Sequence, residues 1–475
     1  MIRRLLVVVS LLTPIAPAFA EDKPLEPIKL NVHPAAAPSP ALKYVLLPEL
    51  KDMNHGNGAI QYYRSFSPEW LNHTRQPDWD KFADYATMPL KELPRKKLDW
   101  VLSYKPLKEL DLASRKETCD WDLTDRVRQD GIGLLLPDMQ TFREMAILLA
   151  VKARLQIADG HFDEALYTLQ TGLMLGKRVG EAPLFVCHLV GVDICSQMLA
   201  QLDELLQAPD APNLYWALTH LPHPLIDLRK PLEGESLWLA KYLPQLPELQ
   251  AALHAKEIAP INAEQEKALL AGMMNVLRVG LLYNEPSGQH RLMLTALCLK
   301  AYPEAKRALI ALGHPAQEVE ALPVLQAVAI HAVMVYLQLR DDLYKWLLLP
   351  YAEGREGLEQ ADRQIRRAKA SMNVVPIFAA LPGVTRLAFA NARLERRIAA
   401  LRCMEAMRIY AAAHNGTPPV SLELIKGVPI PLDPITGRAF DYKAMGNKAT
   451  LYGPPPGKEP PHAGNVAFYE LTFVR

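Results

Sequence analysis

Apolar residues recur every three or four positions along most of this chain, a spacing that predicts α-helices. After Gly416 the pattern changes to short β-prone runs separated by proline, glycine and turn residues, which predicts a few short strands. The predicted fold is therefore mainly α, an irregular helical array followed by a small C-terminal α+β cap. The helices are predicted over 184–208, 262–283, 289–299, 303–312, 323–349 and 386–413, and the strands over 439–442, 449–452 and 466–473.

The clearest pair of helices is predicted within 142–176. Gly160 separates the two apolar stripes and suits the left-handed residue that ends a helix. The small residues Ala153 and Ala165 fall where the helices would pack closely. The pair resembles a tetratricopeptide hairpin over about one motif, and no further copy of that motif follows.

Composition divides the chain into five segments. A signal peptide is predicted over 1–20, and a Pro/Ala-rich extended linker over 21–43. Residues 44–138 carry four of the seven tryptophans, on short helices interrupted by proline. The helical array is placed at 139–385, and a long helix with a small C-terminal α+β module at 386–475.

The N-terminus has the layout of a secretory signal. Arg3 and Arg4 form a basic start, residues 5–12 are apolar, and a small-residue cleavage site ends at Ala20, so the mature chain is expected to begin at Glu21. The alternative is a membrane anchor, but the apolar stretch is too short to cross about 30 Å of hydrocarbon. We therefore expect an exported protein, periplasmic or secreted, with no integral membrane segment after signal removal.

Charge gives no indication of a nucleic-acid or lipid partner. Lys and Arg total 53 against 52 for Asp and Glu, and loss of Arg3 and Arg4 with the signal leaves a balance of −1. A neutral balance provides no general attraction to phosphate groups. Half of the residues are hydrophobic, which is enough for a sizeable core.

Known catalytic signatures are incomplete in this sequence. Gly234-Glu235-Ser236-Leu237-Trp238 starts like a nucleophile elbow but has tryptophan where the turn needs glycine. His220 and His223 lack an evident third metal ligand. No catalytic residue, cofactor or metal is assigned.

The five cysteines are expected to be unpaired, most of them as small core residues: Cys119, Cys187, Cys195, Cys298 and Cys403.

One predicted helix carries a histidine and an acid that could suggest acid–base chemistry. On a helical projection of 323–349, His331 falls on one polar arc with Gln338, Asp341, Asp342 and Lys345. This arrangement predicts a solvent-facing strip on an otherwise apolar helix.

Tryptophan and aspartate alternate in the segment 78–122. Tryptophan faces and carboxylates are the groups that carbohydrate-binding clefts use, and paired carboxylates can hydrolyse glycosides. The alternative is that the tryptophans anchor packing and the aspartates cap short helices. The candidate ligand-binding residues are Asp78, Trp79, Trp100, Asp120, Trp121 and Asp122.

Four long stretches, at 46–66, 119–144, 212–229 and 401–442, resemble a group of exported α-helical proteins of planctomycete-like bacteria that has no assigned activity. This resemblance implies a compartment and an architecture. The tail also resembles the C-terminal part of the type II secretion major pseudopilin, through Tyr410, Gly416, Pro419, Leu422, Asp433, Pro434, Gly437 and Tyr442. The pseudopilin membrane helix is absent, so fibre assembly is not implied.

The helix predicted over 386–413 carries an acid within its apolar stripe. Glu405 lies among apolar positions and Arg408 follows one turn later, which predicts a buried ion pair. The alternative is that the stripe ends early and Glu405 is solvated. Asp433 to Gly437 should form a tight turn that folds the strands back on this helix.

The favoured function is an exported, non-enzymatic helical scaffold that mediates protein–protein interaction, because a helical array is present without an assembled catalytic set. The alternative is a periplasmic carbohydrate-binding protein or glycoside-acting enzyme that uses the segment 78–122. The two differ in whether Trp79, Trp100 and Trp121 meet at an open cleft.

Overall fold

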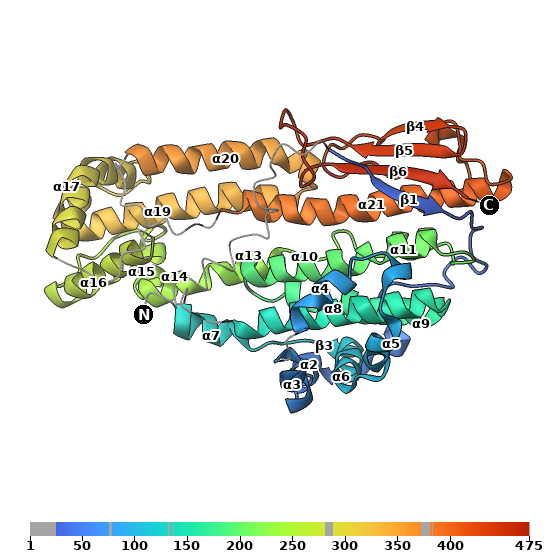
Figure 1. Cartoon of the computed structure of the whole chain (residues 1–475). Helices are drawn as coiled ribbons and strands as arrows, with labels where there is room; N and C mark the ends of the chain where they lie inside the picture. The colour runs from blue at the N-terminus through green and yellow to red at the C-terminus, as the bar shows by residue number, and fades with distance from the viewer. Residues whose placement is uncertain are drawn as a thin grey trace. The chain divides into compact units, whose positions relative to one another are not determined.

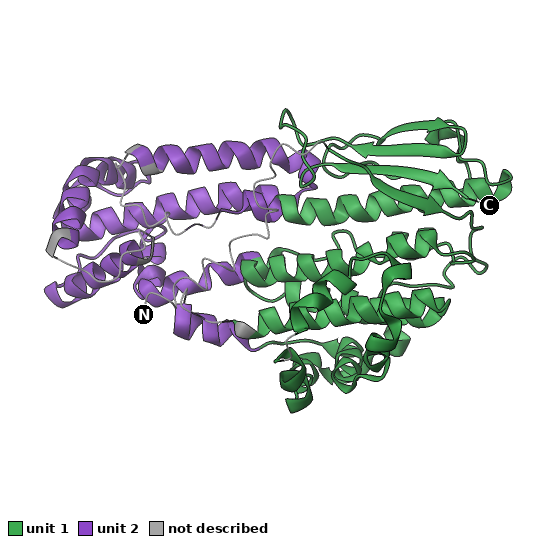
Figure 2. Ribbon diagram, viewed as in Figure 1, with its two compact units in different colours: residues 1–121, 135–231, 389–475 green, residues 122–134, 232–388 purple. Residues whose placement is uncertain are grey.

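The computed structural model of this protein describes residues 25–75, 78–131, 134, 136–280, 288–371, 381 and 383–474. The predicted signal peptide, with its cleavage site at Ala20 and Glu21, lies outside the described residues. The chain divides into two compact units, shown in different colours in Figure 2. Unit 1 comprises 1–121, 135–231 and 389–475, and unit 2 comprises 122–134 and 232–388.

Both units consist mainly of α-helices, and unit 1 also contains a small sheet near the C-terminus, as the sequence predicts (Figure 1). The helices of unit 1 are α2 (Gly58–Arg64), α3 (Pro68–Thr74), α4 (Phe82–Tyr85), α5 (Arg95–Leu98), α6 (Lys105–Ser114), α8 (Pro137–Ala158), α9 (Phe162–Gly180), α10 (Phe185–Ala200), α11 (Leu202–Gln207) and α12 (Tyr215–Thr219). Its strands are β1 (Ile28–Val32), β2 (Asn54–Asn57), β3 (Lys116–Thr118), β4 (Asp441–Met445), β5 (Lys448–Gly453) and β6 (Ala467–Phe473).

The regular secondary structure among the described residues of unit 2 is entirely helical. It contains α7 (Leu123–Asp130), α14 (Leu237–Tyr242), α15 (Leu246–Ala252), α16 (Ala263–Gly280), α17 (Gly288–Ala311), α18 (Ala316–Ala321), α19 (Val324–Tyr344) and α20 (Tyr351–Ser371). Two helices, α13 (Arg229–Glu235) and α21 (Thr385–Ala413), contribute residues to both units.

The helical pair predicted within 142–176 is present as α8 and α9. Gly160 between them has φ +75°, the left-handed conformation that the sequence predicts, and Ala153 and Ala165 are fully buried. On its other side α9 packs closely on α10. A Cβ on Gly176 would lie 2.6 Å from the sulfur of Cys195, so only glycine fits at this crossing.

The region predicted as one helix over 184–208 is α10 followed directly by α11. Among the described residues, 185–207 is long and apolar enough to cross a membrane by length and composition, but 67% of its most apolar window is buried inside the protein. That burial is typical of the core helix of a folded unit.

The predicted break at 300–302 is wrong, because α17 continues through Pro303. A proline inside a helix costs about 3 kcal/mol through its lost hydrogen bond and its clash with the preceding turn. Leu297, Ala301, Ala305 and Leu309 are all buried and keep helical spacing across the proline. Continuous packing of this stripe offsets the local cost.

The C-terminal sheet has the strand order β1-β6-β5-β4. The antiparallel β4, β5 and β6 correspond to the three predicted runs. The first strand, β1, was not predicted. It lies in the segment 21–43, which the sequence predicts to be an extended linker, and it pairs parallel with β6. Leu30 and Val32 alternate inward and are buried, which fixes the register of this strand.

Helix α21 contributes to two buried ion pairs, one within the helix and one with the C-terminal cap. Glu405 and Arg408 are both buried, 3.0 Å apart, which confirms the predicted pair. The predicted turn is also confirmed, since the N–H of Gly437 donates to the carbonyl of Asp433 at 2.8 Å and Gly437 has φ +69°. A second pair, between Arg396 and Asp433, was not predicted.

The predicted solvent strip on the helix now seen as α19 is wrong at one position, His331. This side chain is buried, whereas Gln338, Asp341 and Lys345 are exposed. Burial lowers the pKa of His331, so the ring is held neutral within the helical core of unit 2. All five cysteines lie among the described residues and are thiols rather than disulfides, as predicted.

A second buried histidine makes the stability of unit 1 sensitive to acid. His188 on α10 is fully buried, and its Nδ1 lies 3.1 Å from the carbonyl oxygen of Gly180. Burial lowers the pKa of His188 from 6.5 to about 4. The unfolded chain therefore binds a proton at a higher pH than the folded chain, and protonation favours unfolding.

We expect the contribution of His188 to stability to be present above pH 6.5 and to be lost as the pH falls to about 4. A shift of this size corresponds to a loss of about 3 kcal/mol in the free energy of unfolding. Urea denaturation at a series of pH values measures it. His188→Asn should flatten the pH dependence in this window, and His161→Gln, at an exposed histidine, should not. Equal pH dependence in wild type and His188→Asn would show that another group is responsible.

Candidate docking groove

The tryptophan at position 121 belongs to the core of unit 1. Its ring is buried and stacks on Tyr62 at 5.4 Å between centroids, with Phe142 at 5.1 Å. Its Nε1–H donates to the carbonyl of Arg178 at 2.9 Å. With its hydrogen bond made and both faces packed, Trp121 acts as a packing anchor.

Trp79 and Trp100 lie in a different aromatic cluster. Phe82 joins them, with ring centroids 5.2 Å from Trp79 and 5.9 Å from Trp100. Trp100 also stacks on His73 at 4.5 Å. Both tryptophans are partly exposed. The structure thus brings two of the three candidate tryptophans together and places the third elsewhere.

The candidate aspartates do not gather around these rings. Asp78 forms ion pairs with Lys81 at 2.7 Å and Lys97 at 2.9 Å, and the hydrogen bonds from these two lysines lower its pKa to about 2. A carboxyl group this acidic stays ionised and cannot serve as the general acid of a glycosidase. Asp120 is held through its backbone by Asn57, and Asp122, with φ +53°, belongs to unit 2.

His220 and His223 were considered as metal ligands in the sequence. The Nδ1 of His223 lies 3.3 Å from a carboxylate oxygen of Glu395. Among the residues that the structure describes, no three His, Cys, Asp or Glu side chains gather as a metal site.

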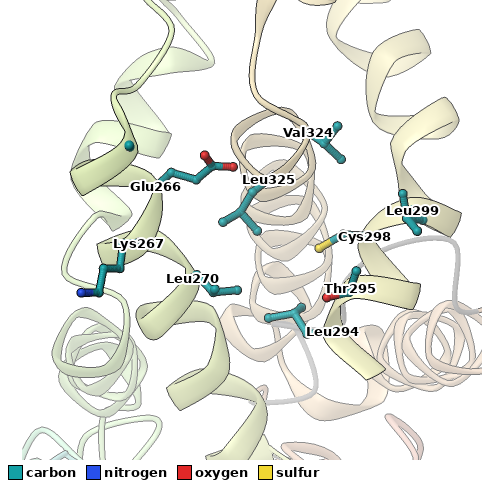
Figure 3. A pocket seen from close by; sticks show the side chains of 10 residues that line it. Glu266, Lys267, Leu270, Leu294, Thr295, Cys298, Leu299, Val324 and Leu325 are labelled. Atoms are coloured by element: carbon teal, nitrogen blue, oxygen red, sulfur yellow. The ribbon is translucent and has the colours of Figure 1, made fainter. Parts of the chain in front are cut away.

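Unit 2 contains an apolar groove between α16 and α17, and the start of α19 completes its lining (Figure 3). Helix α16 begins where Asn262 and Gln265 each accept a hydrogen bond from the other's backbone N–H, both at 2.9 Å. Its buried stripe, with Leu269 and Met273, packs inward. This leaves the neighbouring face of the helix turned towards the groove.

Each wall of the groove follows the helical repeat. Four positions of α16 and four of α17 recur over about two turns of each helix, and the first two residues of α19 complete the lining. The groove has a volume of about 480 Å³. Its lining residues are Ala263, Glu266, Lys267 and Leu270 from α16, Leu294, Thr295, Cys298 and Leu299 from α17, and Val324 and Leu325 from α19.

The groove offers apolar contact with few polar groups. In Figure 3 the carboxylate of Glu266 points toward Leu325, across the groove from the sulfur of Cys298. Burial raises the pKa of Cys298 to about 11, so its thiol stays neutral near pH 7 and behaves as an apolar group. The groove can therefore bury apolar side chains while Glu266 contacts a cation or a hydrogen-bond donor.

At the groove and next to it, α17 exposes two large apolar side chains to solvent, Leu299 in the lining and Leu292 outside it. Leu292 is 71% exposed and Leu299 is 65% exposed, and they are seven residues apart on one face of the helix. The pair leaves an apolar strip exposed along one face of the helix, unlike leucines that are scattered singly over a surface.

Sequence reasoning did not identify the groove, although it predicted the helices that form it. The available signal was the distribution of leucines in 292–299, which lie on more than one face of the helix. A helix that is apolar all round needs more than one covering surface. That pattern predicts apolar surface on several faces of the helix, but it does not say which neighbouring elements cover each face.

Comparisons of this chain with protein-family models, with curated proteins and with solved structures found no match.

Proposed function

We propose that this protein is an exported, non-enzymatic helical scaffold that binds an amphipathic helix of a protein partner in the groove between α16 and α17. The observation that carries the proposal is the lining of the groove: Ala263 and Leu270 lie seven residues apart on α16, and Leu294, Cys298 and Leu299 lie on the facing turns of α17. A groove of this kind accepts the apolar face of a third helix through anchors at i, i+3 or i+4, and i+7.

The residues that line the groove also indicate which side chains a partner segment should present. Leu270, Leu299 and Val324 line the groove and are exposed, so they offer contacts for aliphatic or aromatic anchors. Glu266 would favour a lysine or arginine next to those anchors, since a carboxylate facing an apolar groove is costly unless paired. The expected partner segment is a helix with an apolar stripe and a basic flank.

Export is part of this proposal and is supported by the layout of residues 1–20. In that setting a scaffold would act on other exported proteins. The carbohydrate-binding alternative stays a prediction, and its support is now limited to the pair Trp79 and Trp100, because Trp121 is enclosed in a separate core.

A selection from displayed helical peptides tests the proposal. The mature chain is immobilised and peptides of about five turns, with randomised faces, are selected for binding. We expect the selected peptides to share an apolar stripe at i, i+3 or i+4, and i+7 with a basic residue beside it. Binding should fall at least about tenfold on Leu270→Asp, a loss of about 1.4 kcal/mol or more.

Leu348→Asp is the matched control, because Leu348 is an exposed leucine of the same unit that does not line the groove. Peptides whose binding is equally sensitive to both substitutions, or is insensitive to both, would contradict a role for the groove.

A further inference from the structure

We infer that the helix which fits this groove is α17 of a second copy of the chain, so that two copies form a symmetric dimer through their α16–α17 faces. The inference rests on the proposed function, since it uses the same groove and names the partner. It is carried by two complementary features of unit 2 that share Thr295 and Leu299 on α17, an apolar groove and an exposed apolar ridge that continues to Leu292.

The ridge has the features expected of a groove-binding helix. Leu292 and Leu299 lie at i and i+7 on α17, with Thr295 and Ala296, both exposed, between them. These are the anchor positions that a groove with helical spacing accepts. Two leucines exposed by 71% and 65% leave a substantial apolar surface in contact with water in the single chain.

The charges of the two features are complementary. The ridge segment 291–300 contains Arg291 and Lys300 and no acidic residue. The opposing wall, at the start of α16, contains Glu264 and Glu266 with one base, Lys267. Placing the ridge of one copy in the groove of another brings bases to acids, which favours this pairing and its orientation.

The groove and the ridge share α17, so the same contact can be made twice between two copies related by a two-fold axis. When the ridge of the first copy enters the groove of the second, a two-fold axis places the ridge of the second copy in the groove of the first. Such an interface closes on itself and stops at two copies. It also buries both exposed leucines of each chain.

The test uses the mature full-length chain in sedimentation equilibrium over a wide range of concentration. Wild type should show reversible dimer formation, and Leu292→Asp should weaken it at least tenfold, whereas Leu348→Asp should leave it unchanged. Because Leu292 does not line the groove, Leu292→Asp should still bind the peptides selected above. A chain that is monomeric at every concentration, yet binds those peptides, overturns the dimer and leaves the proposed function standing.

Charge reversal tests the orientation. Glu266→Lys and Arg291→Glu should each weaken self-association, because each places like charges together in both halves of the interface. Mixing the two variants should restore it, since both contacts in the mixed dimer then join opposite charges. Failure of the mixture to associate would contradict the pairing of α17 with the α16 wall.

Discussion

Replacing Arg396 by alanine is expected to lower the free energy of unfolding by about 3–5 kcal/mol, because it leaves a buried carboxylate without its partner. Arg396 and Asp433 are almost completely buried. Their side chains form two hydrogen bonds, at 2.8 and 2.6 Å. The same guanidinium also donates to the carbonyls of Asn465 and Pro454, at 2.9 and 2.6 Å. One side chain thus fixes two loops of the cap to α21, the turn at Asp433 and the loop between β5 and β6.

Urea denaturation measures this change, with Lys448→Ala as the control. Lys448 also forms an ion pair, with Glu470 at 3.4 Å, but its side chain is 57% exposed. An exposed pair contributes less than about 1 kcal/mol. If Arg396→Ala destabilised the protein no more than Lys448→Ala, the buried pair would not be what holds the cap.

Replacing Glu405 by alanine is expected to have a comparable effect, about 3–5 kcal/mol, because it strands the buried Arg408. The guanidinium of Arg408 donates to the carbonyls of His33, Ala211 and Pro212, at 2.7, 2.8 and 3.2 Å. These bonds tie α21 to the residue that follows β1 and to the loop after α11. Glu405 balances the charge of Arg408, the side chain that makes all these contacts.

Hydrogen exchange distinguishes this role from general destabilisation. In Glu405→Ala the amides of β1 should lose protection before those of α9, since β1 is held through the His33 carbonyl. Glu405→Gln, which keeps an acceptor but removes the charge, should fall between wild type and alanine. Uniform loss of protection across unit 1 would argue against a local attachment of β1.

The two buried ion pairs show which contacts could be predicted from the sequence alone and which could not. Glu405 and Arg408 are three residues apart on one helix, so helical geometry alone placed them together. Arg396 and Asp433 are 37 residues apart and meet only after the cap has folded onto α21. The spacing of residues along the chain therefore predicts the pair of Glu405 and Arg408 but not the pair of Arg396 and Asp433.

The same distinction applies to the sheet and to the groove. The strands β4, β5 and β6 are neighbours in sequence and were predicted, whereas β1 pairs with β6 from the opposite end of the chain. The helices of the groove were predicted from their apolar periodicity. Their relative placement, which leaves Leu270 and Leu294 lining an open groove, depends on tertiary packing. His331 was misplaced for the same reason, because its burial depends on which helices surround α19.

The most direct measurement of the central claim is the equilibrium binding of one selected amphipathic helical peptide to the mature chain, followed by fluorescence anisotropy. The experiment is done at protein concentrations below those at which copies associate. The groove account predicts saturable binding that falls at least about tenfold in Leu270→Asp and is unchanged in Leu348→Asp. Binding that is unchanged in Leu270→Asp would contradict it.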